Sequence, residues 1–171
     1  MKDQPAPRVK PRRKRGQLPL RLKGGKTEPR TQFAALCYRY EGEKLRICLV
    51  TSRRSKRWIL PKGWPMHKET PAAAAATEAW EEAGLTGQPI DRCLGVFAYV
   101  KTLSQSLTPV IVMVYPVEID TIHEDWPEKR QRKRKWFSPR KAAKRIAEPE
   151  LRRIVAQFDP GELLGPPLRK G

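Results

Sequence analysis

The sequence lacks the features of a membrane or secreted protein. No segment approaches the roughly 18 consecutive apolar residues that a membrane-spanning helix needs. No apolar stretch follows the basic N-terminal residues, as it would in a secretory signal. The three cysteines, Cys37, Cys48 and Cys93, form no CxxC pair and leave an odd count. These absences argue against a disulfide framework or a structural zinc site, and they predict a cytoplasmic protein.

Acidic residues are scarce, and the resulting excess of positive charge is unevenly distributed. The 171 residues contain 36 Lys and Arg against 18 Asp and Glu, a net charge of +18. Residues 1–30 hold 11 basic and 2 acidic side chains, residues 128–145 hold 10 and 1, and the rest of the chain sums to zero. A body of balanced charge with 39% apolar residues can fill one hydrophobic core.

The two basic blocks predict different roles. Residues 1–29 combine basic residues with prolines and show no apolar periodicity, which predicts a disordered tail. That tail either contacts RNA or another polyanion or only improves solubility. The run 129–135 leads directly into Trp136 and Phe137, which predicts a loop that enters a strand. Such a loop would hold its cations in fixed positions where they can bind phosphate groups. The alternative is a solvated loop without that role. The block 128–145 is therefore a second candidate contact for polyanions.

The order of local patterns predicts one mixed α/β domain over residues 30–159. Strand-forming segments at 32–39 and 45–51 flank a turn and predict a hairpin. Further strands are expected at 93–100, at 110–118 and from about residue 134. Thr70 as N-cap and Gly84 as the left-handed stop predict a helix over 71–83. Helical spacing of apolar residues predicts a second helix over 149–158, and residues 160–171 are expected to be an irregular tail.

Three glutamates share one face of the predicted helix. Glu78, Glu81 and Glu82 have i, i+3 and i+4 spacing, and they lie near the helix C-terminus. Their mutual repulsion and the helix dipole both oppose this arrangement. A divalent cation would resolve the conflict, because Mg²⁺ binds one or two carboxylates together with substrate phosphates. The alternative is a solvated acidic helix face.

The segment from Gly63 to Leu85 resembles the signature of the Nudix hydrolase superfamily. That signature is Gly-x5-Glu-x7-Arg-Glu-(aliphatic)-x-Glu-Glu-x-Gly-(aliphatic), and its fixed residues are present here as Gly63, Glu69, Glu78, Glu81, Glu82, Gly84 and Leu85. Thr77 stands where the family has an arginine that pairs with the carboxylate at Glu69. The resemblance implies a Nudix fold, a mixed β-sheet sandwiched between helices.

Shorter matches resemble the diphosphoinositol polyphosphate phosphohydrolase branch of that superfamily. They comprise Gly95 to Phe97, Glu124 to Trp126, and Arg132 to Phe137, whereas Trp58 to Gly63 resembles many members of the superfamily. Lys62 and Trp64 depart from the branch, which often has glycines there, and Glu150 stands about where it has a lysine.

The resemblance implies roles for particular residues. Glu78, Glu82 and the carbonyl of Gly63 would bind Mg²⁺ or Mn²⁺, with Glu118 or Glu124 as further candidates. Glu81 would be the general base, while Glu69 and Gly84 would be structural. The substrate-binding residues would be Arg30, Ser52, Arg53, Lys62 and Arg132.

Three functions compete at this point. The leading one is metal-dependent cleavage of a phosphoanhydride bond in a diphosphoinositol polyphosphate or a dinucleoside polyphosphate. The second is removal of pyrophosphate from the 5′ end of RNA, with residues 1–29 holding the strand. The third is a non-catalytic module that binds RNA or a nucleotide, which the loss of the box arginine at Thr77 favours and the three retained glutamates oppose.

Overall fold

The computed structural model describes residues 30–103 and 105–164, and its centre is one eight-stranded sheet. In chain order the strands are β1 (Arg30–Glu41), β2 (Lys44–Thr51), β3 (Trp58–Ile59), β4 (Lys62–Gly63), β5 (Leu85–Pro89), β6 (Gly95–Leu103), β7 (Ser106–Ile122) and β8 (Arg134–Phe137). The strand order is β3-β2-β1-β7-β5, with β4 beside β1, β6 beside β7 and β8 beside β2. The central pair, β1 and β7, is parallel, whereas the other pairings between described strands are antiparallel. The sheet is therefore mixed, as expected.

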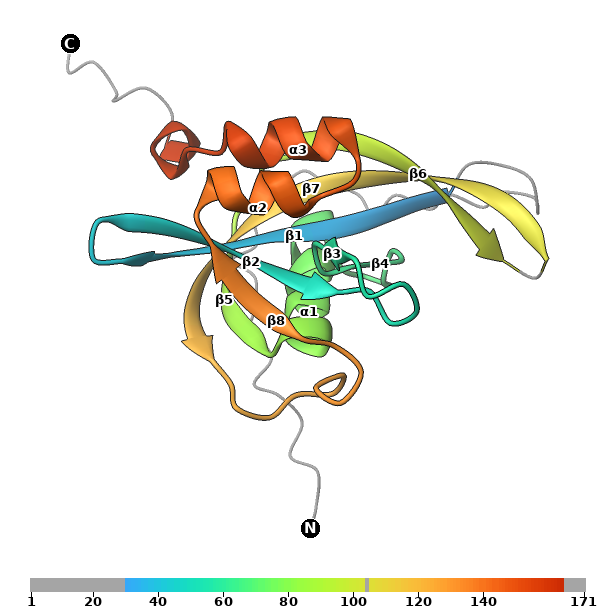
Figure 1. Ribbon diagram of the computed structural model, residues 1–171, viewed down its shortest axis with the longest axis horizontal. Helices are drawn as coiled ribbons and strands as arrows, with labels where there is room; N and C mark the ends of the chain where they lie inside the picture. The colour runs from blue at the N-terminus through green and yellow to red at the C-terminus, as the bar shows by residue number, and fades with distance from the viewer. Residues whose placement is uncertain (1–29, 104, 165–171) are drawn as a thin grey trace.

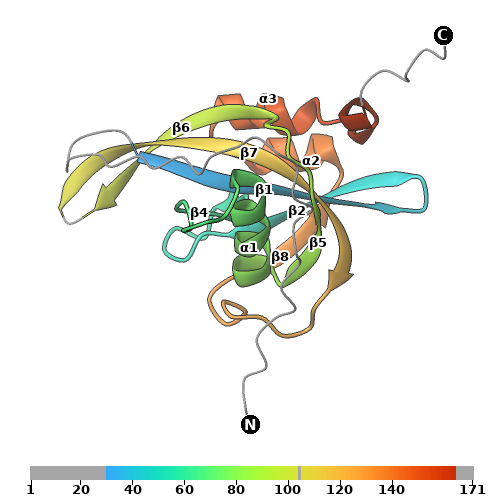
Figure 2. The same ribbon diagram turned by 180° about the vertical axis from the view of Figure 1, so that it is seen from behind.

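Helices cover both faces of this sheet. The helices α2 (Pro139–Arg145) and α3 (Pro149–Ala156) lie together on one face (Figure 1), whereas α1 (Pro71–Ala83) lies on the other, as the reverse view shows (Figure 2). Each face has its own apolar core. Leu36 and Tyr38 of β1 belong to the core under α2 and α3, and Ala35 and Cys37 belong to the core under α1. Because β1 is buried on both sides, its sequence is a continuous apolar run. The predicted fold is confirmed.

The hairpin of β6 and β7 is longer than predicted. Strands were expected at 93–100 and 110–118, yet pairing continues outward to Leu103 opposite Ser106. The first residue of β1, Arg30, pairs with Val110. The end of the hairpin therefore extends past β1 and projects from the body of the sheet (Figure 1). Polar and apolar residues mix in this arm, so its local sequence shows little strand periodicity.

Five elements were not predicted. Two of them are the two-residue strands β3 and β4. The segment of β5 contains Gly87 and Pro89, which favour a turn, but Gly87 lies where the register shifts and a side chain would clash with the carbonyl of Glu118. The helix α2 begins at Ser138, whose hydroxyl accepts from the amide of Lys141, although the segment reads as part of the basic run. The 3₁₀ helix η1 (Pro160–Leu164) corrects the expectation of an irregular segment there. Asp159 stabilises its start by accepting from the amide of Gly161.

The expectations for residues 1–29 and 165–171 lie outside the described residues, so the limits of the domain stay a prediction. No helix in the described ranges is long and apolar enough to cross a membrane.

Candidate active site

The helix α1 has the ends that its sequence predicts. The hydroxyl of Thr70 accepts from the amide of Ala73 at 3.2 Å, and Pro71 occupies the first turn. Gly84 ends the helix in the left-handed conformation, with φ of 64°. Between these ends, Ala75, Ala79 and Ala83 are completely buried against the sheet. Small side chains let the helix axis approach the sheet closely, which places Glu78 against Gly63 of β4.

Two of the three glutamates are buried between α1 and the sheet. Glu78 is 8% exposed and Glu82 is 6% exposed, whereas Glu81 faces solvent. The carboxylate of Glu78 lies directly against the α-carbon of Gly63, where any side chain would overlap it. Gly63 is held there by β4, which pairs with Phe33 of β1. The structure thus brings together Gly63, Glu78 and Glu82, the residues that the box predicts as metal ligands.

Glu82 is bound by basic groups. Its carboxylate accepts from the guanidinium of Arg132 at 2.8 Å and from the amide of Lys62 at 3.4 Å. Arg132 is itself almost completely buried and also donates to Glu128 at 3.2 Å and to the carbonyl of Thr51 at 3.1 Å. Buried charges require partners of this kind. Arg132 therefore joins β2, α1 and the loop before β8 at the centre of the site.

The site strongly disfavours negative charge on its carboxyl groups. Burial raises the pKa of Glu78 to about 7, and repulsion from Glu82, Glu81 and Glu128 adds to this shift. Burial also raises the pKa of Glu82 to about 7, although Arg132 and Lys62 oppose the shift. The pKa of Glu81 is raised by burial and by Glu128. A bound divalent cation would remove this repulsion and favour the ionised form of all three.

The donor chemistry suits a hard cation, which takes carboxylate and carbonyl oxygens. Within residues 30–103 and 105–164, however, no three His, Cys, Asp or Glu side chains are placed to hold an ion as they stand. One reason is that Glu82 is turned toward Arg132. A metal at Glu78, Glu82 and Gly63 therefore requires the Glu82 carboxylate to be shared with Arg132 or released from it.

The predicted substrate-binding residues fall into two groups. Lys62 and Arg132 contact Glu82, and Arg53 lies 3.5 Å from Glu128. Arg30 lies farther out, with its guanidinium 6.0 Å from the centre of the Trp64 ring. The hydroxyl of Ser52 is hydrogen-bonded to the hydroxyl of Ser55 at 2.7 Å and accepts from the amide of Arg57 at 3.1 Å. Ser52 thus shapes the loop after β2.

Two box residues predicted to be structural differ in their surroundings. Gly84 is required by its positive φ, and a side chain there would also collide with Trp126 and Arg134. Glu69 is exposed, and the described part of the chain shows no ion pair to it. Thr77, which replaces the arginine expected to pair with Glu69, donates its hydroxyl to the carbonyl of Ala73 instead.

Glu128 is the site residue that sequence reasoning missed. It raises the pKa values of the helix glutamates, pairs with Arg132, and lies near Arg53. Neither Glu118 nor Glu124, the further candidates, contributes to these shifts. One feature of the sequence could have pointed to it, since Glu128 is the only acidic residue in the block 128–145.

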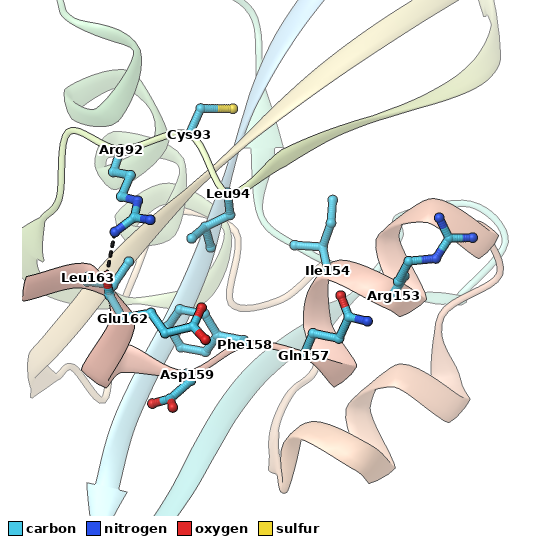
Figure 3. A pocket seen from close by; sticks show the side chains of 10 residues that line it. All are labelled: Arg92, Cys93, Leu94, Arg153, Ile154, Gln157, Phe158, Asp159, Glu162 and Leu163. Carbon is cyan, nitrogen blue, oxygen red and sulfur yellow. Dashed lines mark hydrogen bonds between the residues drawn. The ribbon is translucent and has the colours of Figure 1, made fainter. Parts of the chain in front are cut away.

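A separate cavity of about 240 Å³ lies away from these carboxylates (Figure 3). It is enclosed by the segment before β6, by α3 and by η1, and Arg92 crosses it to donate to the carbonyl of Glu162. No residue of the glutamate cluster lines it. The carboxylates of the candidate site are therefore concentrated where α1 meets β4 and not at this cavity.

Comparisons with known proteins agree with this geometry. The family model described as NUDIX domain matches residues 29–158. The chain belongs to the Nudix domain family, and the resemblance of the box is confirmed. Among solved structures, a C. elegans Ap4A hydrolase covers 74% of this chain and 92% of its own, with a TM-score of 0.53 and 18% identity. A NUDIX hydrolase from Nitrosomonas europaea gives a TM-score of 0.57 at 18% identity, covering 75% and 86%. At such identities these likenesses show the fold.

Curated relatives carry the name of the expected branch. Diphosphoinositol polyphosphate phosphohydrolase 3-alpha of Homo sapiens is 37% identical over 114 residues, which span 65% of each protein. Diphosphoinositol polyphosphate phosphohydrolase 2 of Rattus norvegicus is 35% identical over 113 residues, 65% of this chain and 59% of its own. The chain thus matches less than two thirds of the length of these relatives.

Proposed function

We propose that this protein is a metal-dependent hydrolase that cleaves a phosphoanhydride bond in a highly phosphorylated small molecule. The proposal rests mainly on one observation. Glu78, Glu81 and Glu82 form a partly buried cluster beside Glu128, and the pKa of each of these three helix glutamates is raised. Stability alone disfavours such a cluster, and perturbed carboxyl groups of this kind are typical of catalytic sites.

Divalent cations suit this cluster and its substrate. Glu78, Glu82 and the carbonyl of Gly63 would hold Mg²⁺ or Mn²⁺, which when bound would neutralise phosphate charge and make a coordinated water more acidic. Glu81 is the most accessible of the three helix glutamates. It would accept the proton of the attacking water as general base.

Cations around the cluster support a substrate that is rich in phosphate. Lys62 lies in the site, 5.2 Å from the centre of the Tyr99 ring, and Arg30 and Lys101 approach the ring of Trp64. Arg132 contacts Glu82 and Arg53 lies near Glu128, so positive charge is available to stabilise an anion as it reacts. The names of the curated relatives, diphosphoinositol polyphosphate phosphohydrolases, favour a diphosphoinositol polyphosphate as the substrate, with a dinucleoside polyphosphate as the second candidate.

The test is phosphate release in Mg²⁺ from a panel of substrates. The panel holds diphosphoinositol pentakisphosphate, diadenosine polyphosphates, ADP-ribose, nucleoside triphosphates and 5′-triphosphorylated RNA. The Glu81→Gln variant runs beside the parent, and Glu43→Gln, in the exposed turn between β1 and β2, is the matched control. We expect turnover of one of the first two classes, at least about 100-fold slower in Glu81→Gln, the size of effect that general bases contribute.

Two results would contradict the proposal. Equal turnover by Glu81→Gln and the parent would exclude Glu81 as the base. No phosphate release from any compound of the panel, together with tight binding of the same compounds, would favour the non-catalytic module. In that case Thr77→Arg would test whether the missing box arginine is the cause.

A further inference from the structure

The structure divides the basic block 128–145 between two places. Residues before β8, such as Arg132, enter the candidate active site. Residues of α2 lie on the opposite face of the sheet from α1, beside α3 (Figures 1 and 2). There the two helices form an open groove of about 540 Å³ between them. Basic residues of both α2 and α3 line this groove.

Four cations line the groove. Arg140 and Lys144 come from α2, one helical turn apart, and Arg152 and Arg153 come from α3. No acidic residue lines it, and its floor consists of two alanines and Pro149. Arg140, Lys144 and Arg153 are exposed and form no ion pair among the described residues. Their side chains are thus free of close acidic partners within the described residues, and an anion in the groove would reduce the repulsion among them.

The geometry suits a chain of phosphates better than a single small anion. An open groove lets a strand pass through, and arginines on both walls can bind phosphate groups in bidentate fashion. Sugars can lie on the apolar floor. No aromatic ring lines the groove, so bases have nothing to stack on. Recognition would therefore be independent of base sequence.

The turn that joins α2 to α3, next to the groove, is within electrostatic reach of Lys62. Burial lowers the pKa of Lys62 to about 8, and the nearby carboxylates of Glu82 and Glu148 oppose that shift. Glu148 belongs to the turn that joins α2 to α3. Only this turn, and not the groove itself, is thereby related to the candidate active site.

We propose that the groove between α2 and α3 binds single-stranded nucleic acid through its phosphodiester backbone. This site is separate from the glutamate cluster, and it does not require that the cluster hydrolyse any substrate.

The test is fluorescence anisotropy with a labelled oligouridylate that ends in a 5′-hydroxyl. This probe has no phosphoanhydride bond, and EDTA is present, so the glutamate cluster is not engaged through a metal. The groove variant is Lys144→Glu/Arg153→Glu. The control is Lys44→Glu/Lys141→Glu, which changes the net charge equally at exposed residues that do not line the groove. Residues 1–29 are the same in both variants, so their contribution cancels.

We expect the groove variant to bind at least tenfold more weakly than the parent at 0.1 M salt, and the control to stay within threefold. The slope of log affinity against log salt should fall by about 1.4 in the groove variant, at about 0.7 for each lost phosphate contact. An oligothymidylate should bind like the RNA, because only the backbone is read. The neutral variant Lys144→Gln/Arg153→Gln, with an unchanged melting temperature, should also lose affinity and so exclude misfolding as the cause.

Three results would overturn the proposal. The control could lose as much affinity as the groove variant, which would mean attraction to overall charge. The groove variant could bind like the parent. A polyglutamate peptide could compete as well as the oligouridylate at equal charge, which would point to an acidic protein partner. Turnover of the phosphoanhydride panel by the groove variant is measured in parallel, so a failure here is distinct from a failure of the proposed hydrolase function.

Discussion

Glu78 offers a direct test of the conflict between stability and function at the glutamate cluster. It is buried and surrounded by Glu81, Glu82 and Glu128, and the described part of the chain shows no ion pair to its carboxylate. Replacement by glutamine keeps its shape and removes the charge. Without a divalent cation, Glu78→Gln should therefore be more stable than the parent above neutral pH, although it should lose metal-dependent activity.

The magnitude follows from the pKa of Glu78, which rises from 4.5 to about 7 on folding. One pKa unit corresponds to about 1.4 kcal/mol, so the largest gain in unfolding free energy for Glu78→Gln is about 3.5 kcal/mol. Partial solvent access and coupling to Glu82 screen this value, and we expect about 1–2 kcal/mol. For a domain of this size that is a rise of about 2–8 °C in melting temperature.

The sign depends on pH. A carboxyl group whose pKa is raised by folding stabilises the fold fully below its unfolded pKa, and this contribution is lost as pH rises through the folded value. The parent in EDTA should therefore lose unfolding free energy between about pH 5 and pH 8, and Glu78→Gln should lose less. Urea unfolding followed by tryptophan fluorescence measures both. The reasoning would be refuted if Glu78→Gln were no more stable than the parent at pH 8. It would also be refuted if the variant gained as much stability over the parent at pH 5 as at pH 8.

Two other substitutions test neighbouring contacts. Gly63→Ala should be destabilised by about 1–3 kcal/mol, because its methyl group would overlap the carboxylate of Glu78. Thermal unfolding and turnover would check this, and normal activity would contradict the close approach of the two residues. Arg132→Met leaves the buried charge of Glu82 without its partner and should cost about 3–5 kcal/mol in EDTA. Adding Glu82→Gln should recover part of that loss, and additive losses in the double variant would exclude a direct pairing.

The parts of the site that the sequence predicts are those determined by local interactions. The helix α1 begins at Thr70 and ends at Gly84 as expected, because a side-chain cap and a left-handed glycine act within one turn of chain. The burial of Glu78 and Glu82 on one face of that helix follows from its 3.6-residue period.

The parts that the sequence did not predict depend on distant contacts. The strand β5 contains residues typical of a turn and becomes a strand only by pairing with β7. Glu128 gains its importance from Arg132 and from the helix glutamates, which lie far earlier in the chain. Local propensity carries no information about such pairings, so tertiary context overrides it.

The pairing of individual cations changes the meaning of the basic run before β8. Its net charge suggests many free cations for phosphate, yet Arg132 is held by Glu82 and Glu128, and Arg134 donates to the carbonyls of Ala83 and His123. These two arginines attach the run to the C-terminal end of α1. Thr77 provides no charge to the site, whereas Arg132 provides one from a different segment. Because this charge already balances Glu82, a phosphate-rich substrate must either compete for Arg132 or rely on the cations around it.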